Sequence, residues 1–460
     1  MRLPFGYMTK RPLMQKEIEE LVGAGNTCDN WNNIRVLQDF VPKNIKNSKF
    51  TGKIKLHGFT GKTCSYKGVE FTTGIFNSWI NESVIEDACI YDVKLFSNSV
   101  ACEDSLIFNV GSIICDKEMS QIKVGTESGH RVLKRMFSEQ DRTVIGRGAK
   151  VCNVNALENL HLGDFSCIEN GAIVQDSIIE NNSVVMDNAI VKSSFIGAFS
   201  HIGEAEISNS LLGPLMQVHH HSLLISALWA EGRGNVGYGA NVGSNHTGRM
   251  PDQEITPGLG QFFGLGCSIK FPANFTEAPF TMIATGVVCE PQRLKFPFSL
   301  IKNGELVGVN EIIPGWVYSK NIYGILRNVY KWDKRSGVKN SLNLFFSKTI
   351  ADSIIKACNT LKEFLLDKNT LPLIITEEVL FGIGSNYVRA ENIVKIIEAY
   401  EMYIEDYNFY QKNKKLRPSI ISRVEENLKR DEIRGQKIFD DYMDFHPKNA
   451  DFFEWLGELS

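Results

Sequence analysis

The residues of this 460-residue chain best suited to chemistry are three consecutive histidines, His219, His220 and His221. They make up three of the nine histidines, so their clustering is far from random placement. An imidazole titrates near neutral pH, and it can therefore act as a general base or as a metal ligand. In an extended segment, His219 and His221 would share one face and His220 would lie on the other.

A second polar stretch follows in the Gly-rich run Gly243–Arg249, which contains Asn245 and His246. Three interpretations of the two histidine groups stay open. In the first, one of His219, His221 and His246 is a general base for a hydroxyl or amine that attacks a thioester. Asn245 or a backbone amide would then support the oxyanion. In the second, His219 or His221 binds zinc together with His246. In the third, the histidines are polar wall residues without a chemical role.

Charged residues elsewhere are candidates for binding the substrate. We expect Arg233, Arg249 and Lys270 to contact a phosphate or carboxylate, because they project from Gly-rich turns. The alternative is that each is a solvated surface charge. A further polar cluster, in a segment that interrupts the repeat described next, consists of Glu127, His130 and Arg131. If that segment folds over a flat face, it would act as a lid and the cluster would line the site.

A repeat must position these residues. From residue 162 onward, aliphatic residues recur every five or six positions, at Leu162, Ile168, Val174, Ile179, Val185, Val191, Ile196, Ile202, Ile207 and Leu212. A small residue stands two positions before most of them, at Ser166, Ala172, Ser177, Ser183, Ala189, Ser194, Ser200, Ala205 and Ser210. Neither a helical nor a simple strand period produces this count. Short strands joined by tight turns do, with three strands closing a coil of about seventeen or eighteen residues. We therefore predict a mainly β chain built around a parallel β-helix.

Two steps of the repeat, Ile196–His201 and Val236–Asn241, follow the order aliphatic, Gly, any, any, small, any. Over about residues 50–300 the chain thus resembles the hexapeptide-repeat superfamily of left-handed parallel β-helices. The resemblance implies a homotrimer with one catalytic histidine in a cleft between subunits. It also implies transfer of an acyl group from acyl-CoA or acyl carrier protein to a sugar or sugar-nucleotide acceptor. Because γ-class carbonic anhydrases belong to the same superfamily, a zinc site is an alternative.

Three local features make the chain similar to a group of uncharacterised bacterial β-helix proteins. They are the histidine run, the tripeptide Ser244–His246 and the pair Lys331–Trp332. This second resemblance brings no activity with it. A non-catalytic scaffold that assembles with partners therefore stays open beside the transferase.

The residue pattern along the chain predicts three regions. We expect residues 1–49 to be an N-terminal lead-in segment. Residues 50–337 are expected to form the β-helix, with a looped excursion at 116–142 and a capping segment near 279–337. Residues 338–460 show helical periodicity and predict an α-helical domain.

Local patterns add detail. Gln15–Val22 predicts a helix that stops at Gly23, and Arg131–Ser138 predicts one or two helical turns. Aliphatic residues step by five at Ile75, Ile80, Ile85, Ile90, Leu95 and Val100. Such steps are also typical of square, right-handed helices, so the handedness of residues 50–115 stays open, although we favour one continuous left-handed prism.

Composition limits the function classes. With 50 basic and 53 acidic residues the net charge is −3, which argues against a nucleic-acid or anionic-membrane partner. No apolar run approaches the ~18 residues of a membrane span, and the N-terminus lacks the apolar core of a signal peptide. The ten cysteines are scattered, as expected of buried thiols in a reducing compartment. We therefore expect a cytoplasmic protein.

Overall fold

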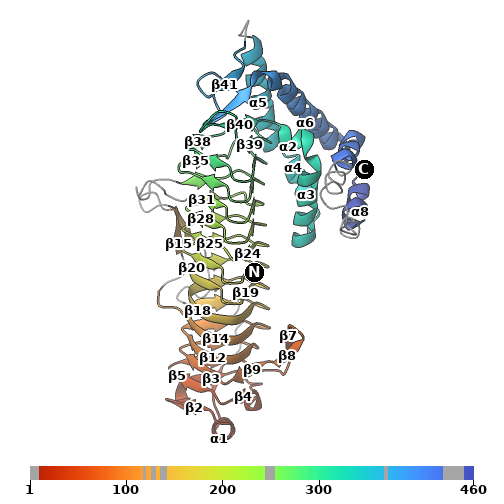
Figure 1. Ribbon diagram of the computed structural model, residues 1–460. Coiled ribbons are helices and arrows are strands. Elements are labelled where there is room, and N and C mark those ends of the chain that lie inside the picture. The colour runs from red at the N-terminus through yellow and green to blue at the C-terminus, as the bar shows by residue number, and fades with distance from the viewer. Residues whose placement is uncertain are drawn as a thin grey trace, which may run out of the picture. The chain divides into compact units, whose positions relative to one another are not determined.

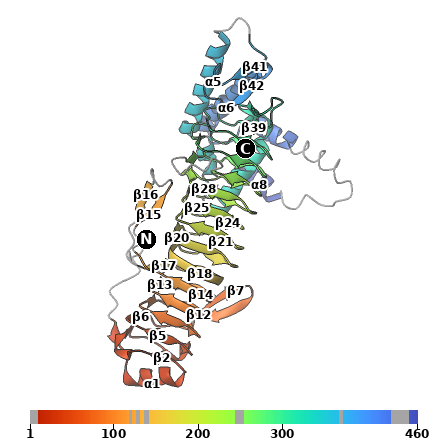
Figure 2. The same cartoon turned by 60° about the vertical axis from the view of Figure 1, so that its left-hand side comes forward.

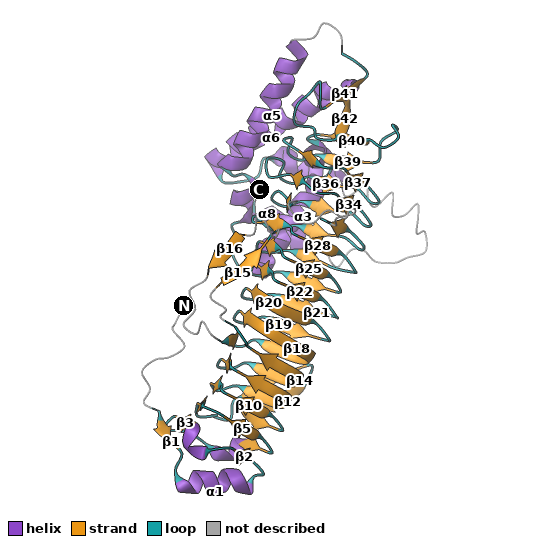
Figure 3. Cartoon of the chain, turned by 90° about the vertical axis from the view of Figure 1, so that its left-hand side faces the viewer, coloured by secondary structure: helices purple, strands orange, loops and turns teal. Residues whose placement is uncertain are grey.

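The computed structural model describes residues 10–117, 121–125, 131–134, 142–243, 254–366, 371–427 and 450–459. These residues fall into two compact units, which we call unit 1 (residues 10–230) and unit 2 (residues 231–459). Unit 1 is a stack of short parallel strands, and unit 2 contains further stacked strands followed by helices (Figures 1 and 3). The predicted fold class, a mainly β parallel helix with a C-terminal helical region, is confirmed.

Each coil of unit 1 contributes strand segments to three parallel ladders, which form the faces of a prism. Face A consists of β4 (Ile45–Lys46), β9 (Gly74–Phe76), β12 (Cys89–Ser97), β14 (Leu106–Ile114), β18 (Lys150–Leu162), β19 (Cys167–Glu169), β21 (Val184–Met186), β24 (His201–Gly203) and β27 (Gln217–Val218). Face B consists of β2 (Thr27–Cys28), β5 (Lys49–Thr51), β10 (Trp79–Asn81), the later parts of β12 and β14, the middle of β18, β20 (Ile173–Ile179), β22 (Ile190–Lys192), β25 (Glu206–Ser208) and β28 (Leu223–Ile225).

Face C is the third ladder. It consists of β3 (Ile34–Val36), β6 (Ile54–Leu56), β11 (Val84–Ile85), β13 (Ser99–Ala101), β17 (Thr143–Ile145), the ends of β18 and β20, β23 (Phe195–Ile196), β26 (Leu211–Leu212) and β29 (Leu228–Trp229). The ten aliphatic residues that define the repeat between Leu162 and Leu212 are each at most 1% exposed. They fill the interior of the prism, as the sequence predicts.

Serine hydroxyls explain the small residue that precedes the aliphatic. The Oγ of Ser177 accepts a hydrogen bond from the Ser194 amide, and the Oγ of Ser194 accepts one from the Ser210 amide, each at 3.1 Å. Ser194 also donates to the carbonyl of Lys192 at 2.7 Å. The three serines are fully buried. The position two residues before each aliphatic is therefore restricted to small residues by space and, where it is serine, also by hydrogen bonds that link successive coils.

In the coil after residue 90 the register differs from the expected five-residue steps. Phe96 pairs with the inward Ile80, so Phe96 points into the prism where Leu95 was expected. Ala101 is inward in place of Val100 in the same way. The expectation was wrong because the corner takes one residue more than the count allowed, and a shift of one residue exchanges the two sides of a strand.

Coil pairing begins before residue 50, where the sequence set the start of the β-helix. Thr27 pairs with Lys49 and Ile34 pairs with Ile54, both in parallel. The remaining N-terminal elements are β1 (Arg11–Pro12), α1 (Gln15–Gly23), η1 (Trp31–Asn33) and η2 (Pro42–Asn44). The helix expected at Gln15–Val22 is α1.

Two ribbons cover outer surfaces of the prism (Figure 2). The hairpin β7 (Thr63–Tyr66) and β8 (Val69–Thr72) packs on face A. The ribbon β15 (Gln121–Val124) and β16 (Arg131–Lys134) packs on face C, where Ile122 and Val124 are buried. The helical turns expected from Arg131 are therefore wrong for the residues described, because alternate apolar side chains of this excursion lie against the apolar face C.

Unit 2 continues the coil pattern with shorter strands. They are β30 (Asn235–Val236), β31 (Asn241–Val242), β32 (Ile255–Thr256), β33 (Phe262–Phe263), β34 (Ser268–Ile269), β35 (Ala273–Asn274), β36 (Met282–Ile283), β37 (Val288–Cys289), β38 (Gln292–Arg293) and β39 (Leu300–Lys302). β40 (Asn310–Ile313) then runs antiparallel to β39 and ends the parallel stacking. β41 (Ile374–Thr376) and β42 (Asn386–Arg389) extend that edge.

Aromatic side chains join the last coils to the helices of unit 2. Phe280 and Phe298 stack with their ring centroids 5.2 Å apart, and Phe345 meets both edge-on. Phe298 also contacts Tyr318 and Tyr403. All five are at most 4% exposed, so these rings form the core of the helical region.

The helical region begins at residue 316, before the expected boundary at 338. Its elements are α2 (Trp316–Lys320), α3 (Ile322–Ser336), α4 (Ser341–Phe345), α5 (Lys348–Leu366), η3 (Ala390–Asn392), α6 (Ile393–Asn413), a helical segment at 418–427 and α8 (Ala450–Glu458). Every helix in the described part of the chain falls short of the length and apolar character that a bilayer-crossing segment needs.

Candidate functional site

The outward side chains of face A change in character along the prism. Next to the inward aliphatics of β9, β12, β14 and β18 they are Phe76, Tyr91, Phe108 and Cys152. Further along they include Glu169, Met186, His201, Gln217 and His219, which we call the polar row, and the apolar Cys167 and Val184 lie beside it. Their inward neighbours are fully buried, so strand alternation places the polar row on the outer surface. Each residue of the row is half-buried.

The hairpin β7–β8 covers the apolar part of face A and ends where the polar row begins. Phe71 of the hairpin packs with Cys89, Leu106 and Cys152 of the coils. At the hairpin tip, the hydroxyl of Tyr66 donates to Glu169 Oε2 at 2.6 Å. The hairpin therefore shields the apolar surface from water, but the strands of the hairpin do not cover the polar row.

His201 and His219 lie on successive coils of the polar row and contact each other. Their ring centroids are 4.9 Å apart and the rings are edge to face. Gly203 of β24 lies next to His219 and Met186. A Cβ atom at Gly203 would lie 3.7 Å from His219 Nδ1 and 3.8 Å from the Cγ of Met186. Both separations are ordinary van der Waals contacts, so Gly203 lies directly beside the Nδ1 edge of His219.

The contacts of Gln217 favour one tautomer of His219. The side-chain amide of Gln217 donates through Nε2 to the carbonyl of Met216 at 2.9 Å. Its Oε1 therefore faces His219 Nε2, at 3.2 Å, and can only accept. The neutral imidazole of His219 then has its hydrogen on Nε2 and its lone pair on Nδ1. His201 Nε2 lies 3.1 Å from the sulfur of Met186, a weak acceptor, which favours the same tautomer for His201.

His220 and His221 occupy the corner after β27. Both have left-handed backbones, with φ of 56° and 59°. Their amides donate to the carbonyls of Gly203 at 3.1 Å and Glu204 at 2.7 Å. Strand alternation has ended here, so the expectation that His219 and His221 share a face is wrong. His220 Nδ1 lies 3.1 Å from a Glu204 carboxylate oxygen, and the His220 side chain is 66% exposed. His221 is exposed as well.

Five of the predicted site residues lie outside the described part of the chain. They are Glu127, His130, Asn245, His246 and Arg249. The backbone of Arg131 is in β16, and its side chain is likewise not described. The meeting of the two histidine groups therefore stays a prediction.

Arg233 belongs to unit 2. One guanidinium nitrogen donates to the carbonyl of Glu231 at 3.1 Å, and Nε is buried without a hydrogen-bond partner among the described residues. Burial lowers the pKa of Arg233, and the nearby Glu231 opposes that shift. A desolvated guanidinium held in this way is suited to an anionic group.

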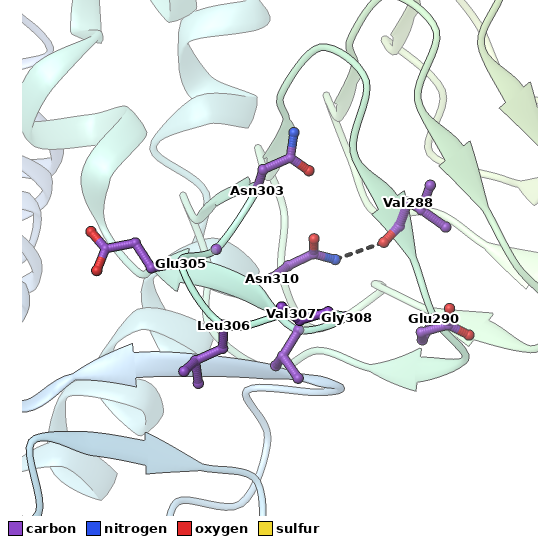
Figure 4. A pocket seen from close by; sticks show the side chains of 10 residues that line it. Val288, Glu290, Asn303, Glu305, Leu306, Val307, Gly308 and Asn310 are labelled. Carbon is purple, nitrogen blue, oxygen red and sulfur yellow. Dashed lines mark hydrogen bonds between the residues drawn. The ribbon is translucent and has the colours of Figure 1, made fainter.

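Lys270, the other described cation among the predicted site residues of unit 2, already has a partner. Its Nζ lies 2.5 Å from Glu290. Glu290 also lines a shallow depression of about 320 Å³ (Figure 4). It is formed mainly by residues 303–309, the loop that joins β39 to β40, and by Asn310 at the start of β40. There Asn310 donates to the carbonyl of Val288 at 2.7 Å. None of the predicted site residues that the structure describes lines this depression.

A zinc site would need several ligands that converge on one point. Within the described ranges, no three His, Cys, Asp or Glu side chains gather closely enough to hold a metal ion. The zinc interpretation also requires His246, whose position is not described. The described residues therefore add nothing in favour of zinc.

Sequence reasoning missed His201, Gln217 and Met186 as parts of the site. The signal that could have found them is the coil period itself. His201 lies one coil before His219, and a residue one coil away on the same face is a spatial neighbour.

Comparisons with known proteins give few functional clues. The model of a domain of unknown function (DUF4954) matches residues 10–134. A protein of Treponema pallidum (strain Nichols), described as an uncharacterized protein, is 26% identical over 474 residues. The match covers 84% of this chain and 64% of that protein, so the chain spans under two thirds of its relative's length.

A solved structure of an acetyltransferase candidate from Desulfovibrio desulfuricans G20 is also similar. It is 11% identical, and the match covers 61% of this chain and 73% of that chain with a TM-score of 0.12. A likeness at this level supports no argument about activity. The chemistry of the polar row must therefore be argued from its own residues.

Proposed function

We propose that this chain is an acyltransferase of the hexapeptide-repeat type and that His219 is its general base. The observation that carries the proposal is the pair of contacts that Gln217 makes. They favour the tautomer of the imidazole with its lone pair on Nδ1, at the half-buried surface of a parallel β-helix. The donor we propose is acyl-CoA or acyl carrier protein, and the acceptor is a hydroxyl or amine of a sugar or sugar nucleotide.

The proposed reaction needs one proton acceptor. A hydroxyl or amine of the acceptor gives its proton to His219 Nδ1 as its oxygen or nitrogen bonds to the thioester carbonyl carbon. The carbon–sulfur bond then breaks, and the imidazolium returns the proton to the departing thiolate. During the imidazolium stage, Gln217 Oε1 accepts from Nε2 and stabilises the charge. Asn245 remains the proposed oxyanion donor, and Arg233 and Arg249 remain proposed contacts for a phosphate.

The first experiment looks for a donor. Thermal unfolding is measured with a panel of acyl-CoAs, with UDP- and CMP-sugars and with buffer alone, since a ligand that binds the folded chain stabilises it by RT ln(1 + [L]/Kd). The second experiment uses the stabilising pair and measures thiol release. We expect His219→Gln to lower kcat/KM by about 10²- to 10⁴-fold, the usual contribution of a general base.

His221→Asn is the matched control. It removes an imidazole from the same tripeptide, and asparagine tolerates the left-handed backbone found there. We expect this variant to keep the wild-type rate. A His219→Gln variant with full activity would overturn the proposal. If no thioester is turned over by a folded chain, the scaffold alternative gains support. About one zinc per chain in the purified protein would favour the zinc alternative.

The homotrimer is also a proposal. Light scattering of the purified chain tests it, since a trimer would have three times the mass of 51.7 kDa. If a monomer turns over thioesters, catalysis does not require the trimer, because the catalytic residues proposed here all lie in one chain.

A further inference from the structure

Two cysteines on different elements of unit 1 face the same small cluster. Cys64 lies in β7 of the hairpin, where it pairs with Phe71 of β8. Cys89 lies in β12 of the coil beneath, and its thiol donates to the carbonyl of Phe71 at 3.4 Å. Both belong to the apolar cluster under the hairpin. The Cys64 thiol donates to the carbonyl of Asp104 at 3.3 Å. Both thiols therefore lie at the boundary between the hairpin and the prism.

Partial exposure makes Cys64 the more accessible member of the pair, and its pKa is shifted in the direction that favours the thiolate. The pKa of Cys64 is lowered to about 7, first by the Cys89 thiol and to a smaller degree by the charge of Lys150, while burial and the carboxylates of Asp104 and Asp87 oppose that shift. The pKa of Cys89 is raised, first through its interaction with Cys64 and then by burial. Cys64 is half-buried, whereas Cys89 is fully buried.

The other cysteines differ in this respect. Cys28 is half-buried like Cys64, yet its pKa is raised to about 11 by burial. The pKa values of the remaining eight cysteines are raised as well, with burial as the first cause in all but Cys89. Cys64 alone among the ten combines partial exposure, a lowered pKa and a second thiol beside it.

We propose that Cys64 and Cys89 form a site of reversible oxidation, in which a small disulfide compound converts them to an intramolecular disulfide that fastens the hairpin β7–β8 to the prism. This inference is independent of the proposed acyl transfer. Without the disulfide, the hairpin is held by non-covalent contacts such as Lys150 Nζ to the carbonyl of Ser65 at 2.8 Å and Tyr91 hydroxyl to the carbonyl of Thr72 at 2.8 Å.

The oxidation proceeds in two exchanges. The Cys64 thiolate attacks one sulfur of glutathione disulfide, a new S–S bond forms and one glutathione thiolate leaves. Cys89 then attacks the Cys64 sulfur, and its proton passes to the second glutathione as that thiolate leaves. Two protein thiols are oxidised to one disulfide, and one glutathione disulfide is reduced to two thiols.

A trypsin digest of the full chain can read this reaction directly. Trypsin cuts after Lys62, Lys67 and Lys94, so Cys64 and Cys89 fall in separate peptides, 63–67 and 68–94, with one cysteine each. After treatment with glutathione disulfide and alkylation, mass spectrometry should find these two peptides joined. The join should disappear with dithiothreitol. Before oxidation, iodoacetamide at pH 7 should label Cys64 at least about tenfold faster than Cys28.

Single-cysteine variants separate the role of Cys64, which attacks first, from that of Cys89, which closes the disulfide. Cys89→Ser should stop the reaction at a glutathione adduct on Cys64, because the second thiol is missing. Cys64→Ser should give neither adduct nor join, and Cys28→Ser, the matched control, should give the wild-type join. The inference is overturned if the wild-type chain shows no joined peptides, or if Cys28 is labelled as fast as Cys64. Both readouts use the unaltered chain and therefore hold even if a variant fails to fold.

Discussion

Replacing Ser194 by alanine tests how the coils are linked. The Oγ of Ser194 accepts from the Ser210 amide at 3.1 Å and donates to the Lys192 carbonyl at 2.7 Å. The Lys192 carbonyl keeps a second partner, the amide of Asn209 at 3.1 Å. The Ser210 amide loses its acceptor, and Ser210 is fully buried, so water cannot easily replace the hydroxyl. An orphaned buried amide costs about 1–3 kcal/mol, which corresponds to an increase of about 5- to 150-fold in local opening.

Hydrogen exchange read by mass spectrometry is the suitable assay, because a stack of coils can open locally without unfolding as a whole. In Ser194→Ala, peptides that cover residues 203–212 should exchange faster than in wild type by the factor above. Ser208→Ala is the control, since its half-buried side chain faces outward from the same coil and forms no such link among the described residues. If the two variants exchange alike, the serine hydroxyls do not link the coils as argued.

Three further predictions concern stability. Phe298→Ala should destabilise unit 2 by about 3–5 kcal/mol in calorimetry, because it empties the middle of the aromatic core, and Phe298→Leu should cost less than half of that. His57 has its pKa lowered to about 4, first by burial and then by the charge of Lys10. The unfolded chain therefore binds the proton at a higher pH than the folded chain, so stability should fall by up to about 3 kcal/mol as the pH drops from 7 to 4. Urea titrations at several pH values should show this slope in wild type and a flatter one in His57→Gln. Asp406→Ala should cost about 3–5 kcal/mol by circular dichroism melting, since it strands Arg423, 2.6 Å away, and the buried Tyr318 hydroxyl that donates to the same carboxylate. Replacing Asp406 and Arg423 with apolar residues together with Tyr318→Phe should recover most of the loss.

Much of the fold could be predicted from the sequence because the repeat is visible within each short stretch of the chain. Each coil repeats the same inward aliphatic and the same small residue, so spacing along the chain translates directly into stacking. The prediction failed where a corner took an extra residue, as at Phe96, and where an excursion had too short a pattern to distinguish strand from helix, as at Arg131. In both places the deciding contact was made with a neighbouring coil or face.

The candidate site was harder to predict. The sequence drew attention to the tripeptide His219–His221, but it could not show that the strand ends at Val218 and that His220 and His221 form a corner. It also gave no reason to select Gln217, whose importance comes from a hydrogen bond that fixes a tautomer.

What the sequence by itself determined is the parallel β-helix and the helical C-terminal region, since both follow from periodicity that each segment carries within itself. What only the tertiary structure decided is which side chains meet. His201 reaches His219, and Cys64 of the hairpin reaches Cys89, only after the chain has wound through a coil or folded back as a ribbon. Chemistry depends on such contacts between distant residues, and their partners are chosen by the stacking register rather than by any local pattern.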